Sequence, residues 1–274
     1  MNSEIRRGLA ASIVLFALVF SLFALAQTAE EKAERGLAIA AEARRRDTGF
    51  GDSSAELLMI LRGRGGDEKR RELRATTLEV RNDGNKTIVI FDSPIDVKGT
   101  ALLTYSHRTG DDDQWLYLPA LKRVKRIGSS NKSGPFMGSE FTYEDLASQE
   151  VEKFTHRWIR DEACPGQEFE SLQCFVVERL PVDADSGYSR QVAWIDRNEY
   201  RTVQIEYYDR KASPLKTLTL TRYKQYLGRY WRSNEMLMVN RQTGKSTRLI
   251  WTKYAFGTGL TENDFTPQAL TRGR

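Results

Sequence analysis

The sequence from Ser54 onward consists almost entirely of short stretches in which apolar and polar residues alternate, and this pattern constrains the fold more than any other feature. Alternation with a period of two is typical of β-strands that bury one face. Turn signals such as Asn198, Gly228 and Thr243-Gly244 separate the stretches at short intervals, and no long helical pattern lies between them, so an antiparallel sheet is favoured over a parallel one. The predicted strands are Glu56–Arg62, Arg70–Arg81, Lys86–Asp92, Gly99–His107, Gln114–Leu118, Lys122–Ile127, Val151–Glu162, Leu172–Pro181, Ser189–Asp196, Arg201–Tyr208, Pro214–Leu227, Tyr230–Asn240 and Lys245–Phe256.

The loop Gly128–Tyr143 combines glycine and serine residues with large apolar side chains, among them Phe136, Met137 and Phe141. A glycine- and serine-rich segment does not form a core of its own, so these side chains need another surface to pack against. We predict that the loop covers an apolar concavity of the sheet. A short helix is expected directly after it, from Thr142 to Ser148.

Residues 1–26 have the three parts of a secretory signal peptide. Arg6 and Arg7 precede an apolar run from Leu9 to Phe23, and Ala24-Leu25-Ala26 is a small-x-small cleavage site. We expect this segment to be removed on export and residues 27–274 to form a single domain. An uncleaved N-terminal anchor is the alternative. No cysteine lies near the cleavage site, so the exported chain is expected to be soluble rather than lipid-anchored.

The segment Thr28–Arg46 is predicted to form an amphipathic helix. Ala33, Leu37, Ala40 and Ala41 recur at helical spacing. Glutamates near the start and arginines at the end have the signs that the helix dipole favours. We expect this helix to pack on the sheet.

Two cysteines, Cys164 and Cys174, flank the turn Pro165-Gly166 where one predicted strand ends and the next begins. In an exported chain, such a pair at the base of a hairpin predicts a disulfide. Its short loop corresponds to a stabilisation of about 2.5–3 kcal/mol in the chain-entropy model.

The polar residues favour binding over catalysis. Lysine and arginine are interspersed with nearly as many acids, for a formal net charge of +5, which does not match the basic stripe of a nucleic-acid-binding protein. The two histidines, His107 and His156, are not accompanied by a G-x-S-x-G motif. Asp111-Asp112-Asp113 lacks the ligand spacing and turn glycine of a calcium loop. We therefore expect no enzymatic activity, no metal, no cofactor and no nucleic-acid partner.

Aromatic and methionine side chains recur along the predicted strands at positions consistent with one face of the sheet. An antiparallel sheet that only short helices can cover leaves part of its apolar face without protein partners. For any single residue, an ordinary sheet–helix core is the alternative explanation. The candidate cavity residues are Trp115, Tyr117, Phe136, Met137, Phe141, Trp194, Tyr207, Trp231, Met236, Met238 and Trp251.

Four cations, Lys122, Arg123, Lys125 and Arg126, lie on one short predicted strand. They are candidates for contacting an anionic head group or an acidic partner. Alternatively, they protect the edge of the sheet against pairing with another chain.

Long segments in the same order along the chain carry a resemblance to a known family. They are FDSPIDVKGTALLTYSH (Phe91–His107), DDDQWLYLPALKRVKRI (Asp111–Ile127), NKSGPFMGSEFTYEDL (Asn131–Leu146), DRNEYRTVQIEYYDR (Asp196–Arg210), TGKSTRLIW (Thr243–Trp251) and FGTGLTENDF (Phe256–Phe265). In them the chain resembles the outer-membrane lipoprotein-sorting proteins, a LolA-like family of Gram-negative periplasmic carriers. The resemblance implies a mainly β fold, an incomplete antiparallel β-barrel with N-terminal and short internal helices covering its concave face.

The resemblance also implies a function and partners. A protein of this kind is expected to bind lipid or lipoprotein acyl chains in the periplasm and to pass them towards the outer membrane as a monomer. An inner-membrane exporter of the resistance-nodulation-division type would supply the cargo, and an outer-membrane acceptor would receive it. The alternative function is that of a non-carrier accessory or scaffold module of such an exporter.

Overall fold

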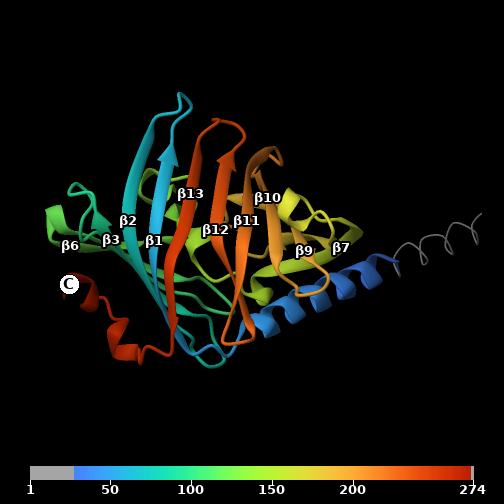
Figure 1. Ribbon diagram of the computed structural model, residues 1–274, viewed down its shortest axis with the longest axis horizontal. Helices are drawn as coiled ribbons and strands as arrows, with labels where there is room; N and C mark the ends of the chain where they lie inside the picture. The colour runs from blue at the N-terminus through green and yellow to red at the C-terminus, as the bar shows by residue number, and fades with distance from the viewer. Residues whose placement is uncertain (1–27, 273–274) are drawn as a thin grey trace, which may run out of the picture.

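The computed structural model describes residues 28–272, so the predicted signal peptide, residues 1–26, lies outside the described residues. In the described part, thirteen strands form one sheet (Figure 1). Each predicted strand is present, with ends that differ by a few residues, which confirms the prediction made from alternation. The strands are β1 (Asp52–Arg62), β2 (Glu68–Leu78), β3 (Lys86–Ser93), β4 (Ala101–Tyr105), β5 (Asp113–Leu118), β6 (Arg123–Ile127), β7 (Phe154–Ala163), β8 (Gln173–Pro181), β9 (Tyr188–Asp196), β10 (Thr202–Asp209), β11 (Pro214–Tyr226), β12 (Tyr230–Asn240) and β13 (Ser246–Phe256).

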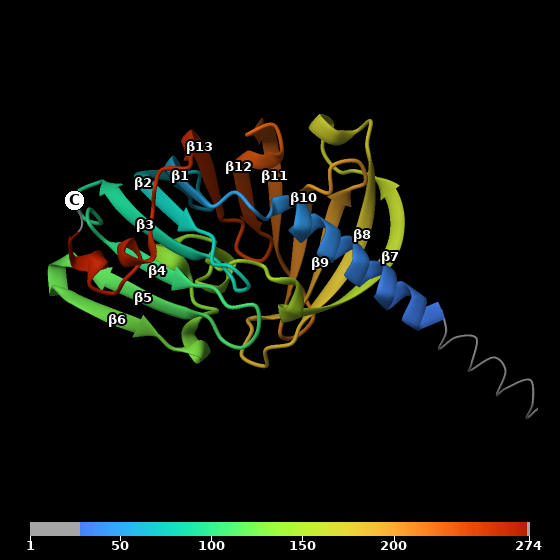
Figure 2. The ribbon, with the colours of Figure 1, turned by 90° about the horizontal axis from the view of Figure 1, so that it is seen from below.

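The order of the strands explains why the barrel is incomplete. Short connections make sequence neighbours into sheet neighbours, and the exception is the antiparallel pair β1–β13, which joins the meander β1–β6 to the meander β7–β13. Strands β6 and β7 remain as the two edges of the sheet. The sheet is strongly curved, and Figure 2 shows it from below as an open curve. The predicted fold, an incomplete antiparallel barrel, is confirmed.

The main core lies on the concave side of the sheet. In β1, Ala55, Leu57 and Met59 are buried at alternating positions. They pack in one cluster with residues of the other strands, such as Leu73 of β2 and Met238 of β12. The period of two fixes the register, because a slip by one residue would move these side chains to the opposite face.

A helix of residues 28–47 confirms the predicted N-terminal helix and runs across strands β7–β10 (Figure 2). It presents a different face than expected: Gly36 and Ile39 are buried, whereas Leu37 and Ala41 of the predicted stripe are exposed. A Cβ on Gly36 would lie 2.6 Å from the amide nitrogen of Trp158, so the absence of a side chain is what allows the close approach to β7. Within residues 28–272, no helix has the length and apolar character needed to cross a membrane.

The connection between the two edge strands, residues 128–153, is called the crossing segment here. It contains four short 3₁₀ turns, of which η4 (Glu144–Leu146) replaces the longer helix predicted after the loop. Phe136 and Phe141 are 1% and 3% exposed and belong to the main core. The predicted loop therefore covers the concave face as part of the core, because its aromatic side chains fill space between the sheet's own side chains.

The outer face of β3–β5 is covered by the C-terminal segment. Thr261 caps the 3₁₀ turn η7 (Glu262–Asp264) through a capping box, and Phe265 is fully buried directly after it. Phe265 packs with Leu103, whereas Leu102, the preceding residue of β4, belongs to the concave core. Adjacent residues of a strand point to opposite faces, so the C-terminal segment lies outside the curve.

Cys164 and Cys174 form the predicted disulfide, with their Cα atoms 5.0 Å apart and a sequence separation of 10. It links β7 to β8 at the base of their hairpin. The two cysteines pack in a separate cluster with Val176 and Trp194. Closing a loop of this size is worth about 2.7 kcal/mol in the chain-entropy model.

Candidate functional site

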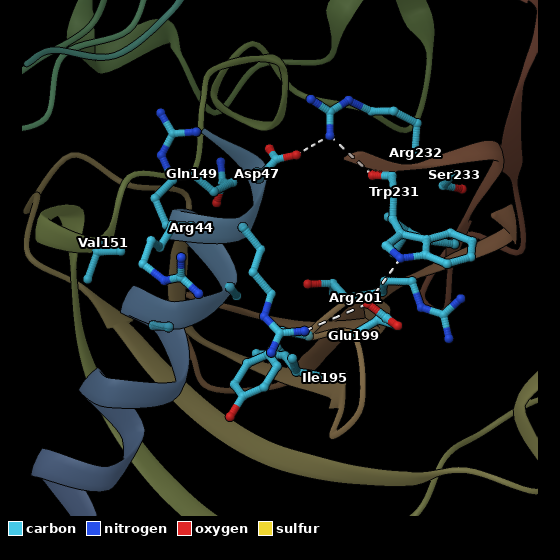
Figure 3. Close-up of a pocket in the computed structure, with 18 of the residues that line it drawn as sticks. Arg44, Asp47, Gln149, Val151, Ile195, Glu199, Arg201, Trp231, Arg232 and Ser233 are labelled. Atoms are coloured by element: carbon cyan, nitrogen blue, oxygen red, sulfur yellow. Dashed lines mark hydrogen bonds and ion pairs between the residues drawn. The ribbon is translucent and has the colours of Figure 1, made fainter. Parts of the chain in front are cut away.

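A cavity of about 770 Å³ lies between the C-terminal half of the N-terminal helix, the end of the crossing segment and strands β7–β12. Figure 3 shows how Arg44 and Asp47 from the helix, Val151 from the crossing segment, and Ile195 and Trp231 from the sheet surround it. Its volume is in the range of sites that hold small organic ligands. It is thus the candidate site of the described structure.

The sheet supplies an apolar wall to this cavity. Val177 of β8, Ala193 and Ile195 of β9, Leu220 of β11 and Met236 of β12 line it. The same alternation that builds the main core therefore continues into the cavity. Methionine and aliphatic side chains at such a wall adapt to the shape of an apolar ligand.

The rest of the lining is strongly basic. Within the described residues, two acids, Asp47 and Glu199, line the cavity against seven arginines. A basic lining beside an apolar wall suits a ligand with an anionic part and an apolar part. The seven arginines are Arg44, Arg45, Arg46, Arg179, Arg201, Arg229 and Arg232.

Ion pairs attach the helix to the structures around the cavity. Arg44 makes a bidentate pair with the buried carboxylate of Glu150, with an Nη2–Oε1 distance of 2.8 Å. On the other side, Arg232 of β12 pairs with Asp47 at the end of the helix (Figure 3). These contacts tie the end of the helix both to the crossing segment and to the sheet.

A buried polar network holds the crossing segment against the concave face. The ammonium group of Lys216 lies 2.5 Å from Oδ2 of Asp145, and both side chains are almost completely buried. Lys216 also donates to the carbonyl oxygen of Glu140 at 3.0 Å, and the Tyr188 hydroxyl donates to Asp145 at 2.8 Å. A buried ion pair persists only when further hydrogen bonds satisfy its members, and this network meets that condition.

Glu144 directly precedes Asp145 in the sequence, and its carboxyl group is partly buried. Burial raises the pKa of Glu144 to about 7, and the adjacent charge of Asp145 adds to the increase. The Gly187 amide donates to its carboxyl group at 3.2 Å. Because the pKa is above the unfolded value of 4.5, the folded chain keeps a proton that the unfolded chain loses between pH 4.5 and 7. Stability is therefore lost as the pH rises through this interval.

Glu144→Gln is expected to make the protein more stable than the wild type at pH 8, by up to about 3 kcal/mol, because glutamine is neutral at every pH. Near pH 4.5 the two proteins should differ little, since the wild-type carboxyl group is then protonated. Urea unfolding at both pH values measures the difference. The exposed Glu170→Gln is the control and should change neither value; a Glu144→Gln protein less stable than the wild type at pH 8 would contradict the expectation.

The structure disperses the predicted cavity residues. Trp231 and Met236 line the cavity, and the indole nitrogen of Trp231 donates to Glu199 at 3.1 Å. Others are in the main concave core: Phe136, Phe141, Tyr207 and Met238 are buried in it, and Met137 and Trp251 pack against it.

The remaining candidates lie away from the cavity. Trp115 and Tyr117 pack against the cluster under the C-terminal segment, and Trp194 packs beside the disulfide. The predicted strands that contain these three residues are present, but their side chains point to the outer face of the sheet, which also carries apolar clusters. The four candidate cations Lys122, Arg123, Lys125 and Arg126 are exposed at the edge of the sheet, three of them on β6.

Sequence reasoning missed the polar residues of the cavity, above all His156 and Arg179. The sequence did contain a signal for them. Every second residue of a strand lies on the same face, so Arg179 shares a face with Phe175 and Val177, and His156 shares a face with Phe154 in the preceding strand. Alternation thus puts a cation and an imidazole on the same strand face as apolar residues, although it does not say which face is concave. No group of metal-ligating side chains occurs within residues 28–272.

Comparisons with known proteins point to one family. A domain described as an outer membrane lipoprotein-sorting protein from Vibrio parahaemolyticus is 54% identical in sequence, with a TM-score of 0.84, over 88% of this chain and 100% of that domain. A family model described as "uncharacterized protein" matches residues 83–272. No curated protein matches the chain.

Two further solved structures share the fold. A DUF1329 family protein from Desulfovibrio piger is 29% identical with a TM-score of 0.81, over 87% of this chain and 99% of that one. A LolA superfamily protein from Nitrosomonas europaea has a TM-score of 0.66 at 17% identity, over 84% of this chain and 96% of that one. At this identity the likeness concerns the fold alone.

Proposed function

The chain belongs to the LolA-like family of outer-membrane lipoprotein-sorting proteins, and from this premise we propose that it carries lipid or lipoprotein acyl chains through the periplasm without catalysis. An inner-membrane exporter would load the carrier, and an acceptor at the outer membrane would unload it. The signal peptide proposed for residues 1–26 would direct export, and the disulfide fits an oxidising compartment.

The observation that carries the proposal is the cavity of about 770 Å³ between the N-terminal helix and the concave sheet. Exposing an acyl chain to water costs about 0.8 kcal/mol per CH₂ group. The aliphatic wall of β8–β12 would screen such a chain, and the helix would close over it. This cover is a single helix, held by ion pairs, by the close contact of Gly36 with β7 and by Ile39, its side chain in the main core.

Ala40→Trp is expected to reduce the lipid that copurifies with the protein by at least several-fold, because Ala40 lines the cavity from the helix and an indole there would occupy the ligand's space. The protein is purified from cells without detergent, and lipid is quantified by native mass spectrometry and extraction. Ala41→Trp is the matched control: Ala41 is exposed on the same helix, and its replacement should leave the lipid content unchanged.

One result would count against the carrier function, and another would show that the tryptophan variant does not test the cavity. Wild-type protein without any copurified lipid would favour the alternative, an accessory module that docks a protein partner. Equal lipid loss in both variants would indicate that the tryptophan disturbs the helix and not the cavity. Circular dichroism of both variants shows whether the tryptophan has unfolded the helix.

A further inference from the structure

The cavity contains one arginine that is neither exposed nor paired with a carboxylate of the described residues. Of its seven arginines, five pair with carboxylates of the described residues, and Arg229 is exposed and donates to the Thr48 carbonyl. Arg179 remains, since it forms no ion pair within residues 28–272. The pairs are Arg44–Glu150, Arg45–Glu42, Arg46–Glu42, Arg201–Asp196 and Arg232–Asp47.

Arg179 is held in place by two contacts, but one of its hydrogen-bond donors has no partner. Its Nε donates to the side-chain oxygen of Gln191 at 2.8 Å, and its guanidinium group lies 4.9 Å from the ring centroid of Phe154. Its Nη2 atom is buried and has no hydrogen-bond partner. Although burial lowers the pKa of Arg179, an arginine stays protonated at neutral pH. A buried charged donor without an acceptor is costly, so it marks a place where an acceptor from outside the chain would bind.

His156 supplies a second buried polar atom without a hydrogen-bond partner, next to Arg179. His156 and Arg179 are direct partners across the β7–β8 pair, so both side chains face the cavity. The Nε2 atom of His156 lies 2.9 Å from the Val151 carbonyl oxygen, which requires the proton on Nε2. Burial lowers the pKa of His156, and the charge of Arg179 contributes. The ring is therefore neutral, and its buried Nδ1 is an acceptor that lacks a donor.

We propose that Arg179 and His156 form a head-group site, in which Arg179 Nη2 binds an anionic oxygen and His156 Nδ1 accepts a hydrogen bond from a hydroxyl of the same head group. The inference rests on the proposed carrier function and narrows its cargo to anionic amphiphiles. The apolar wall of Val177, Ala193 and Ile195 begins next to this pair on the same face of β8 and β9 and would take the acyl chain. Carboxylate and phosphate share the required oxygen chemistry, and a glycerol-phosphate head also offers the hydroxyl.

The test compares three amphiphiles with the same acyl chain on delipidated protein, by titration calorimetry below their critical micelle concentrations. Palmitate carries a carboxylate, 1-palmitoyl-lysophosphatidylglycerol carries a phosphate and hydroxyls, and monopalmitoylglycerol is neutral. Arg179→Met removes the charge and keeps the length of the side chain. It should weaken binding of both anionic probes about 10- to 100-fold and leave the neutral probe unchanged.

The matched control is Arg190→Met, on the adjacent strand β9. Arg190 pairs with Glu178 and lies over the ring of Tyr208, away from the cavity. Arg190→Met changes the net charge by the same amount as Arg179→Met and should leave the binding of all three probes unchanged. His156→Phe should weaken the binding of lysophosphatidylglycerol and leave the binding of palmitate unchanged, because ionised palmitate has no hydroxyl to donate to Nδ1.

The possible outcomes are distinguishable. If no probe binds the wild type, the carrier function fails and the head-group site with it. If all probes bind and Arg179→Met loses none of them, the carrier function stands and the head-group site is wrong. If Arg179→Met and Arg190→Met weaken the anionic probes equally, the effect is one of net charge and the site is again wrong. Urea unfolding of Arg179→Met checks its folding separately, because the substitution removes an unpaired charge but also the hydrogen bond from Nε to the buried Gln191.

Discussion

Lys216→Met is expected to lower the free energy of unfolding by about 3–5 kcal/mol, because it leaves the buried carboxylate of Asp145 without its counter-charge. The two side chains are 3% and 4% exposed and 2.5 Å apart. The substitution also removes the hydrogen bond from Lys216 to the Glu140 carbonyl oxygen. Both lost contacts hold the crossing segment, so hydrogen exchange should accelerate first at residues 140–146. Urea unfolding gives the energy, and exchange measured by mass spectrometry gives the location.

The control for this loss is the exposed Lys211→Met, which should change stability by less than about 0.5 kcal/mol. The double variant Lys216→Met/Asp145→Leu removes both charges and should recover part of the loss. Recovery stays incomplete because the Tyr188 hydroxyl and the Thr142 amide then lack their acceptor. A single variant as stable as the wild type would show that the pair does not anchor the crossing segment.

Gly36→Ala is expected to release the N-terminal helix from the sheet. The added Cβ would lie 2.6 Å from the Trp158 amide nitrogen and 2.7 Å from that of Arg157, and neither backbone atom can move without disturbing β7. Overpacking of this kind costs about 1–3 kcal/mol or more. Hydrogen exchange over residues 28–47 should approach that of an unpacked helix. The copurified lipid should fall as it does in Ala40→Trp, because the helix is one wall of the cavity.

The loss of stability expected for Gly36→Ala is opposite in sign to the effect of helix propensity. Alanine is a better helix former than glycine by about 1 kcal/mol, so helix propensity alone predicts that Gly36→Ala stabilises the protein. Ala38→Gly at an exposed position of the same helix provides the reference, since it should cost about 1 kcal/mol without freeing the helix. If Gly36→Ala is the more stable protein and keeps its lipid, the close contact with β7 does not hold the helix.

Local sequence patterns determined the elements of this protein. Alternation located all thirteen strands, and short turns predicted the antiparallel order. The paired cysteines predicted the disulfide. Each of these features depends on neighbours within about ten residues, so each is readable from one sequence. Family resemblance added the incomplete barrel, which strand patterns do not specify.

Which side of each element faces the cavity was decided by the tertiary structure. Alternation separates the two faces of a strand without saying which one is concave, and here both carry apolar clusters. Trp194 therefore packs outside beside the disulfide, although Trp231 lines the cavity. The helix uses Gly36, and not the more apolar Leu37, because fit against the β7 backbone outweighs side-chain hydrophobicity at that contact.

The sequence by itself thus determined the strands, the helix and the disulfide, because hydrophobic period, turn chemistry and cysteine spacing act locally. The tertiary structure brought His156 next to Arg179 and paired Arg232 of the cavity with Asp47, which is 185 positions away in the chain. The physical reason is that whether a charge is matched depends on the groups around it, and these groups come from separate elements whose register and packing no single element specifies.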